Sequence, residues 1–342
     1  MLNEIGSEFW QKYDRSNKHD GSEVVVLSGR TALDFIIRDL KESGDFRSIM
    51  LPSYCCDSMI EPFVRNSIEV SFYPVSYQGI TFPENDKDAI LLLDYFGYVD
   101  DQITRIAKLA KDNGQIVIYD GTHYLGERAI FADYIFCSYR KWLFCNYSSV
   151  IKVGGQWNIL CPTHTNKAYI ELREKAAELK QNYIYKGVGE KNTYLNMFSD
   201  AEELLEQDYM DYFGEKVECN KTYIADVRRK NAKKLVEGLR EIKEITLWRE
   251  FVSDIDTPLF VPILVEKSIR NELRKYMIEN QIYCPIHWPM TNLHSTANDL
   301  FDMELSLVCD QRYSFDEIDR EIEVIKNFFK GRKINGNESI YN

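Results

Sequence analysis

The chain has 342 residues and a formal net charge of −12, with 44% hydrophobic and 28% charged residues. This composition is typical of a folded globular protein that is long enough for more than one domain. The acidic balance argues against a nucleic-acid partner, because phosphate backbones are bound mainly by clustered Lys and Arg. It leaves room for an anionic small molecule in a locally positive site.

No apolar run approaches the roughly 20 residues needed to span a bilayer, and the first residues lack the basic start and apolar core of a signal peptide. The eight cysteines are scattered without a CxxC pair, which favours reduced thiols and argues against a metal site. We therefore expect a cytoplasmic protein that has no membrane partner.

The chain begins with a polar segment, residues 1–22, whose apolar patch around Phe9 and Trp10 favours an N-terminal helix packed on the body. Residues 23–27 predict a strand that leads into Ser28-Gly29-Arg30-Thr31 and a helical pattern. A strand, a glycine turn and a helix start together form an anion site, because free N–H groups and the positive end of the helix dipole face one point. A Ser-Gly helix cap without any ligand explains this motif alone equally well.

Strands and helices then alternate at regular intervals. Short apolar runs predict strands at residues 48–52, 68–75 and 89–93, and an amphipathic pattern predicts a helix over residues 100–111. This alternation predicts an α/β fold in which a mostly parallel central sheet is sandwiched by helices.

Two further strands carry the most informative polar residues. An apolar run from Ile116 ends in Asp120 with His123 close behind, and a second run from Tyr134 ends in Ser138 with Lys141 close behind. Ligands bind at the carboxyl edge of such sheets. A lysine there can form a Schiff base with pyridoxal 5′-phosphate (PLP), and a carboxylate can hold the pyridine nitrogen protonated.

After residue 165 the regular alternation of strands and helices ends. Residues 166–213 predict helices with a mobile polar loop around 185–192, and residues 220–244 predict a long helix. From 245 onward, short strands and helices predict a smaller C-terminal α+β domain. The predicted organisation is therefore an N-terminal segment (1–22), a large PLP-binding domain (23–244), a small domain (245–330) and a disordered tail (331–342).

With these motifs in place, the chain resembles the fold type I PLP enzymes, and more narrowly the DegT/DnrJ/EryC1/StrS sugar aminotransferases, over about residues 20–330. The resemblance implies an aminotransferase that moves an amino group from Glu or Gln to a nucleotide-linked keto-sugar in amino-sugar or surface-polysaccharide biosynthesis. It also implies a homodimer, because the active sites of that family are built at the subunit interface.

The resemblance further implies residue roles. Lys141 carries the cofactor, Asp120 pairs with its pyridine nitrogen, and His123 lies against its ring and 3-oxygen. The implied phosphate ligands are Gly29, Arg30, Thr31 and Ser138. Cys56 stands where the family has an aromatic residue stacked on the ring. The implied contacts to substrate are His287, Arg312, Tyr313 and Asn192.

The chain departs from the family at several of these positions. Cys56 cannot stack on a ring, which leaves Tyr54 or another group to cover it. Ser138 precedes Lys141 by three residues, whereas sugar aminotransferases typically place that Ser five before the Lys, and no Arg follows Asn192 in the family's Asn-x-Arg pattern. Two alternatives therefore stay open: another PLP-dependent reaction or substrate, and a family member that has lost PLP and serves as a binding subunit.

Overall fold

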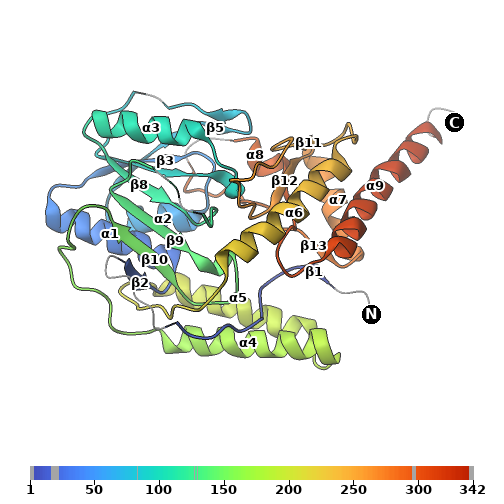
Figure 1. Ribbon diagram of the computed structural model, residues 1–342, viewed down its shortest axis with the longest axis horizontal. Helices are drawn as coiled ribbons and strands as arrows, with labels where there is room; N and C mark the ends of the chain where they lie inside the picture. Colours follow the sequence, from blue (N-terminus) through green and yellow to red (C-terminus); the bar gives the residue numbers. More distant parts are fainter. Residues whose placement is uncertain are drawn as a thin grey trace.

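The structure, a computed structural model, describes residues 4–16, 23–82, 84–126, 128, 130–294 and 298–338. A large α/β part surrounds a seven-stranded sheet, and a smaller part surrounds a three-stranded sheet (Figure 1). The large sheet has the strand order β2 (Glu23–Val26), β10 (Ser148–Lys152), β9 (Tyr134–Ser138), β8 (Ile116–Asp120), β7 (Ala89–Leu93), β3 (Ser48–Pro52) and β4 (Glu69–Tyr73).

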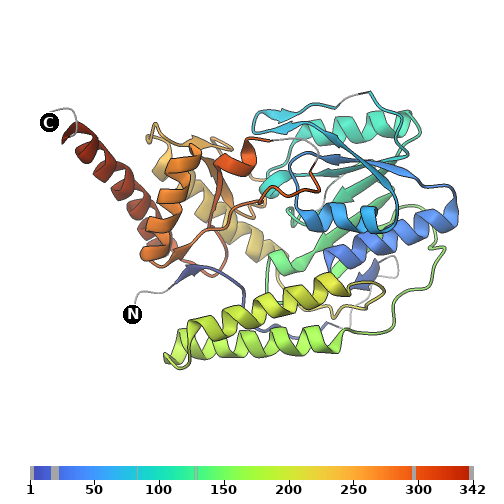
Figure 2. The same cartoon turned by 180° about the vertical axis from the view of Figure 1, so that it is seen from behind.

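Within this sheet, β9, β8, β7, β3 and β4 pair in parallel, and β10 runs antiparallel to both of its neighbours. Helices α1 (Gly29–Ser43) and α2 (Asp57–Arg65) cover one face, and α3 (Asp101–Asp112) covers the other (Figures 1 and 2). Every residue of β3 and β7 is buried, as apolar strands covered on both faces should be. The predicted α/β fold with a mostly parallel sheet is confirmed.

The smaller part contains the antiparallel sheet of β11 (Thr246–Leu247), β12 (Val261–Leu264) and β14 (Glu304–Leu307), with helices α7 (Lys267–Glu279), α8 (Leu300–Met303) and α9 (Phe315–Glu338). Helix α6 (Lys221–Leu239) packs against α9 and β12, so it lies with this part rather than with the large sheet. Helix α9 continues to Glu338, where the sequence predicted a disordered tail from residue 331.

The N-terminal segment is extended where it is described, so the predicted N-terminal helix is wrong. Residues Ile5–Gly6 form strand β1, which pairs in parallel with β13 (Ile282–Tyr283) of the smaller part. Side chains from elsewhere occupy the backbone carbonyls that a helix would use itself: Lys180 Nζ donates to the Glu8 carbonyl at 2.6 Å, and Arg312 donates to the Ser7 carbonyl at 3.2 Å. The segment therefore links the smaller part to the helices beside the large sheet.

Two long helices, α4 (Lys167–Lys186) and α5 (Lys191–Gln207), pack against each other along the edge of the large part (Figure 2). Gly187 ends α4 in the left-handed conformation with φ 63°, which glycine adopts at low cost. The connection is thus shorter than the loop predicted around residues 185–192, and Asn192 lies exposed in the first turn of α5.

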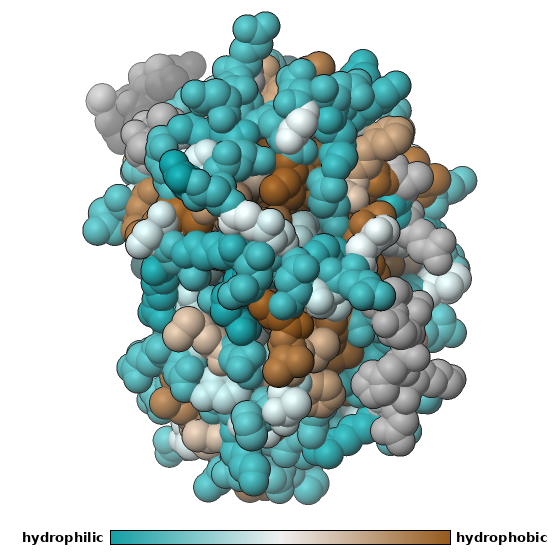
Figure 3. Space-filling model, turned by 90° about the vertical axis from the view of Figure 1, so that its left-hand side faces the viewer, coloured by the Kyte–Doolittle hydropathy of each residue, from teal (hydrophilic) through white to brown (hydrophobic). Residues whose placement is uncertain are grey.

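The surface agrees with the charged composition. Hydrophilic side chains cover most of the face shown in Figure 3, and hydrophobic ones gather there in small groups. A short hairpin of β5 (Val75–Ser76) and β6 (Gly79–Ile80) lies next to α3. Among the helices of the described residues, none has the length and apolar character that a bilayer crossing requires.

Candidate active site

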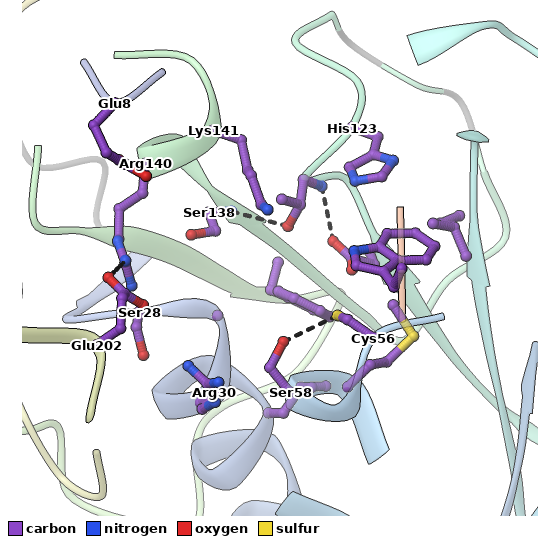
Figure 4. A pocket seen from close by; sticks show the side chains of 18 of the residues that line it. Glu8, Ser28, Arg30, Cys56, Ser58, His123, Ser138, Arg140, Lys141 and Glu202 are labelled. Atoms are coloured by element: carbon purple, nitrogen blue, oxygen red, sulfur yellow. Dashed lines mark hydrogen bonds and ion pairs between the residues drawn. The ribbon is translucent and has the colours of Figure 1, made fainter. Parts of the chain in front are cut away.

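A cavity of about 390 Å³ lies at the carboxyl ends of β2, β8 and β9, the edge at which the sequence predicted a site. Seven of the residues singled out from the sequence line this one cavity (Figure 4): Gly29, Arg30, Cys56, Asp120, His123, Ser138 and Lys141. Because β2, β9, β8 and β3 run in the same direction within one sheet, their carboxyl ends lie along one edge, and this topology brings residues more than 100 positions apart to one space.

The start of helix α1 forms one end of the cavity. Ser28 is the N-cap, and its Oγ accepts the Thr31 N–H at 3.2 Å, so the helix-cap and anion-site interpretations hold together. The Thr31 side chain is used elsewhere, because its hydroxyl donates to the Tyr209 carbonyl at 2.7 Å. A Cβ on Gly29 would come within 3.6 Å of the Ser138 Cβ, which places the glycine turn against the end of β9. The start of α1 and Ser138 therefore form one polar end of the cavity.

Asp120 ends β8 with its carboxylate buried in the cavity wall. Thr122 N–H donates to Asp120 Oδ1 at 2.8 Å, and Thr122 Oγ1 accepts from the Ser138 N–H at 3.1 Å. Thr122 therefore ties the carboxylate to the end of β9, a role that sequence reasoning missed although Thr122 lies between Asp120 and His123. Burial raises the pKa of Asp120 to about 6, against the opposing effects of the Thr122 hydrogen bonds and of the Lys141 charge.

Lys141 ends a short 3₁₀ turn, Tyr139–Lys141, that directly follows β9. The next residue, Trp142, is fully buried, and its Nε1–H donates to the Thr122 carbonyl at 2.8 Å. This anchor fixes the turn to the same loop that holds Asp120. Lys141 itself is exposed and extends toward the cavity from the side opposite α1 (Figure 4).

His123 lies between two flat rings. Its ring stacks on Phe96 (centroids 5.6 Å apart, 30° between planes) and on Trp288 (5.8 Å, 22°). His123 Nδ1 accepts the Phe96 N–H at 3.2 Å, which leaves Nε2 to carry the proton of the neutral ring. Burial lowers the pKa of His123 well below its usual value, and the neighbouring His287 and Lys141 lower it further.

The structure places an aromatic residue from another part of the chain in the lining of the cavity, together with Cys56. Tyr54 is fully buried away from the cavity, where it packs on Tyr95 and donates its hydroxyl to the His287 carbonyl. Trp288 lines the cavity together with His123 and Cys56. The flat ring thus comes from the smaller part of the chain, more than 200 residues from Cys56, and nothing in the sequence around Trp288 indicated this contact.

A second cavity, of about 380 Å³, lies between the two parts of the chain and shares Glu8, Arg140 and Lys141 with the first. It is rich in cations although the whole chain is acidic; its basic lining residues are Arg140, Lys141, Lys191, Arg228, Arg274 and Arg312, against the acidic Glu8 and Asp310. The predicted substrate residues Arg312 and His287 both line it. Lys141 therefore lines both cavities.

The cations of this second cavity differ in how far they are already neutralised. Arg312 forms a two-point ion pair with Asp310 (2.9 and 2.7 Å) and also holds the N-terminal segment, so its charge serves the fold. Within the described residues, Arg274 on α7 donates only through Nε, to the Cys284 carbonyl at 3.2 Å. Arg274, which sequence reasoning missed, thus keeps the donors of its outer guanidinium for a ligand.

The remaining two predicted substrate contacts lie elsewhere. Tyr313 is buried, and its hydroxyl accepts the Gly6 N–H at 2.8 Å, so it fastens strand β1 to the smaller part. It lines neither of the two cavities, and neither does Asn192 on the exposed side of α5. In this single chain, the structure does not bring these two residues to the cavities.

A buried polar chain stands behind His287. His287 Nδ1 lies 2.8 Å from Ser306 Oγ, and the Ser306 hydroxyl in turn donates to the Glu304 carboxyl group. Because the Ser306 hydroxyl donates its hydrogen bond to Glu304, the Ser306 oxygen accepts a hydrogen bond from His287 Nδ1–H. Nε2 of His287 then carries no proton and is free to accept a hydrogen bond. Burial lowers the pKa of His287 well below its usual value and raises the pKa of Glu304 to about 8.

This arrangement makes the stability of the protein depend on pH. Because the pKa of Glu304 is raised in the folded state, the folded chain keeps a proton that the unfolded chain releases above about pH 4.3. The Glu304 contribution to the free energy of unfolding therefore falls as pH rises from about 4.3 to 8. We expect Glu304→Gln to gain stability relative to wild type across this window in urea unfolding, whereas replacing the exposed Glu279 by Gln should give a constant difference. A flat difference for Glu304→Gln would contradict this account.

Known proteins were compared with the chain and with its structure. No family model matches the sequence, and a search of curated proteins finds no match. Solved structures do match. PseC of Helicobacter pylori, an aminotransferase involved in pseudoaminic acid biosynthesis, is 15% identical with a TM-score of 0.62, over 92% of this chain and 87% of that one.

Two further solved structures are similar to the same extent. A DegT DnrJ EryC1 StrS aminotransferase from Brucella abortus is 15% identical with a TM-score of 0.58, over 90% of this chain and 86% of that one. The second is the PLP form of Spr1654 from Streptococcus pneumoniae, which is described as a sugar aminotransferase. It is 13% identical with a TM-score of 0.59, over 90% of this chain and 87% of that one. At these identities the likeness is one of architecture, and the chain has the fold of the DegT/DnrJ/EryC1/StrS sugar aminotransferases.

Proposed function

We propose that this chain is a PLP-dependent aminotransferase that transfers an amino group from Glu or Gln to a nucleotide-linked keto-sugar. One observation carries the proposal: a buried carboxylate, a lysine and a helix start line one cavity, and the lysine is shared with a second, cationic cavity. The fold, which is that of sugar aminotransferases, supports the same activity.

The residues of the first cavity fit PLP by their chemistry. The start of α1 and Ser138 offer N–H and O–H donors for a phosphate group. Asp120 offers a buried carboxylate for the pyridine nitrogen. Burial raises the pKa of Asp120, and a protonated ring nitrogen beside the carboxylate would offset this effect of burial. When bound, PLP supplies an electron sink for the carbanion that forms at the donor's α-carbon.

The chain's own residues then act around that group. The Lys141 amine would hold the cofactor and, once released, would take the proton from the donor's α-carbon as a general base. The neutral His123 offers Nε2–H as a hydrogen-bond donor at the ring, and Trp288 excludes water from one side of the cavity. Ser28 and Thr122 hold the helix start and Asp120 in place.

The second cavity binds the amino acceptor in this proposal. Its surplus of basic residues matches the diphosphate of a nucleotide-linked sugar, and its shared lining residue Lys141 places a keto carbon of that sugar near the first cavity, where Lys141 can move protons to and from the acceptor carbon. Amino-sugar supply for surface polysaccharides, a cytoplasmic location and a homodimer belong to the same proposal.

Arg274 gives this assignment a direct test. Because its outer guanidinium keeps donors for an anionic ligand, we expect Arg274→Gln to raise KM for a nucleotide-linked acceptor by roughly 10-fold to 100-fold, the effect of losing one charge-assisted hydrogen bond. Transfer from the amino donor to the cofactor should be unchanged. Lys275→Gln removes the same charge from the exposed side of the same helix and serves as control. Equal effects of both variants would contradict the assignment.

The activity itself is tested by incubating the protein with PLP, glutamate or glutamine and a panel of keto-sugar nucleotides, with mass spectrometry to detect replacement of the keto oxygen by an amine. Amination of at least one nucleotide sugar is the expected result. Turnover of the donor alone, with other carbonyl acceptors used instead, would favour another PLP-dependent reaction. No PLP binding and no turnover would leave a binding subunit.

A further inference from the structure

One carboxylate in the first cavity is surrounded by cations. Glu202 on α5 forms an ion pair with Arg140, and Arg173, Arg30 and Lys141 lie near enough to affect it. Burial raises the pKa of Glu202, yet these four positive charges outweigh the burial and hold the pKa below its usual value. The negative charge of Glu202 is thus balanced by cations at this point of the cavity, beside the start of α1.

Arg140 is the cation most directly placed to hold an anion here. It stands between Ser138 and Lys141 in the chain, and its side chain runs to Glu202 beside Ser28 (Figure 4). The guanidinium is largely buried, with 17% of the side chain exposed. Within the described residues, Nε of Arg140 is buried without a hydrogen-bond partner. A buried donor without a partner at the wall of a cavity points to a ligand.

The other cations near Glu202 are already engaged. Arg30 pairs with Glu206 at 3.0 Å. Arg173 donates through Nη1 to the Cys145 carbonyl at 2.9 Å and to Asn146 Oδ1 at 2.8 Å, which fixes the turn before β10. Its Nε, like that of Arg140, is buried without a hydrogen-bond partner among the described residues, but the same guanidinium is already tied to that turn. Lys141 has the chemical role proposed above. Among the described residues of this cavity, Arg140 is thus the cation whose only ion pair is with a carboxylate that lines the same cavity.

A phosphate ester needs such a cation. It carries close to two negative charges at neutral pH, whereas a helix start offers roughly half a positive charge and Ser138 offers only a neutral hydroxyl. We propose that Arg140 is a ligand of the cofactor phosphate, and that the Glu202 carboxylate competes with the phosphate for the same guanidinium. This inference rests on the proposed function, since it takes the phosphate to be that of PLP.

The comparison of PLP with pyridoxal, which lacks the phosphate, isolates the contact. Dissociation constants are measured by absorbance titration for wild type, Arg140→Gln, Arg140→Lys and Glu202→Gln. We expect Arg140→Gln to weaken PLP binding by roughly 10-fold to 100-fold, the loss of a charge-assisted contact, and to leave pyridoxal binding unchanged. Arg140→Lys keeps the charge and should recover part of the affinity. Glu202→Gln should bind PLP more tightly than wild type, again without an effect on pyridoxal.

Arg38→Gln is the control, because Arg38 is an ion-paired arginine of helix α1 that lies outside the cavity. It should bind both ligands as wild type does, and thermal unfolding of each variant verifies that it is folded. If Arg140→Gln does not fold, the opposite shift in Glu202→Gln still decides the inference.

The outcomes separate this inference from the proposed function. Equal PLP affinity of wild type and Arg140→Gln, or weaker PLP binding by Glu202→Gln, would overturn the inference and leave a PLP enzyme. Should wild type bind inorganic phosphate but not PLP, with phosphate binding lost in Arg140→Gln, the anion site would stand and the proposed function would fail. Binding of neither ligand by wild type would overturn both.

Discussion

Replacing Lys141 by alanine is expected to lower the rate of amino-group transfer by about 10⁴-fold, the upper range for removal of a positioned acid–base group. The loss should be this large because one amine both holds the cofactor and moves the proton, and because no other lysine lines the first cavity within the described residues. The measurement is the single-turnover rate of transfer from glutamate to PLP. Lys191 lines only the second cavity, so it cannot substitute.

Two variants separate the chemistry of Lys141 from its charge. Lys141→Arg keeps the positive charge but removes the primary amine, and it should be as inactive as Lys141→Ala. Adding a small primary amine to Lys141→Ala should restore part of the proton-transfer rate, because Lys141 lines both cavities and its side chain is exposed. A rate for Lys141→Ala within tenfold of wild type would show that another group carries the reaction.

The second large effect concerns Asp120, for which activity and stability should move in opposite directions. Asp120→Asn removes the charge that holds the ring nitrogen protonated and should lower the transfer rate by roughly 10²-fold to 10³-fold, the usual loss for one preorganised electrostatic contact. Asn can still accept the Thr122 N–H that now reaches Asp120 Oδ1. The rate should therefore fall without a rearrangement of the loop.

The stability part follows from the raised pKa. In the cofactor-free protein, the pKa of Asp120 is about 6 in the folded state and about 3.9 in an unfolded chain. The folded chain binds the extra proton in this window, so the Asp120 contribution to the free energy of unfolding falls as pH rises from about 3.9 to 6. Above pH 6, Asp120→Asn should be more stable than wild type by up to roughly 3 kcal/mol, with no difference below pH 3.9. Urea unfolding of both proteins across this range provides the comparison, and a less stable variant at pH 8 would contradict it.

The central sheet was predictable because its strands are short apolar runs that end in turn residues. The apolar runs from Ile116 and from Tyr134 mark β8 and β9, although β9 includes Ser138, which was expected just past the strand, and parallel topology then brings both ends to one edge. These strands could be predicted because a buried strand has a local apolar pattern in the sequence. The extended shape of the N-terminal segment could not be predicted, because it depends on Lys180 and Arg312, which lie far along the chain.

The same distinction applies to the cavity. Lys141 and His123 follow strand ends, so local sequence indicated them. Trp288, Glu202 and Arg274 reach the two cavities from a loop of the smaller part, from α5 and from α7, and each looks ordinary in its own segment. Their positions at the cavities result from the packing of elements that are remote in the sequence. The hydrophobic periodicity of a single segment does not predict such tertiary contacts.

The most direct test of the account is an absorbance spectrum of the purified protein with added PLP, for wild type and Lys141→Ala, followed by borohydride reduction and peptide mass mapping. We predict a visible band of lysine-bound PLP in wild type, its absence in the variant, and a reduced pyridoxyl group attached at Lys141. No band in either protein, or a pyridoxyl group on a different lysine, would contradict the central claim that this cavity binds PLP through Lys141.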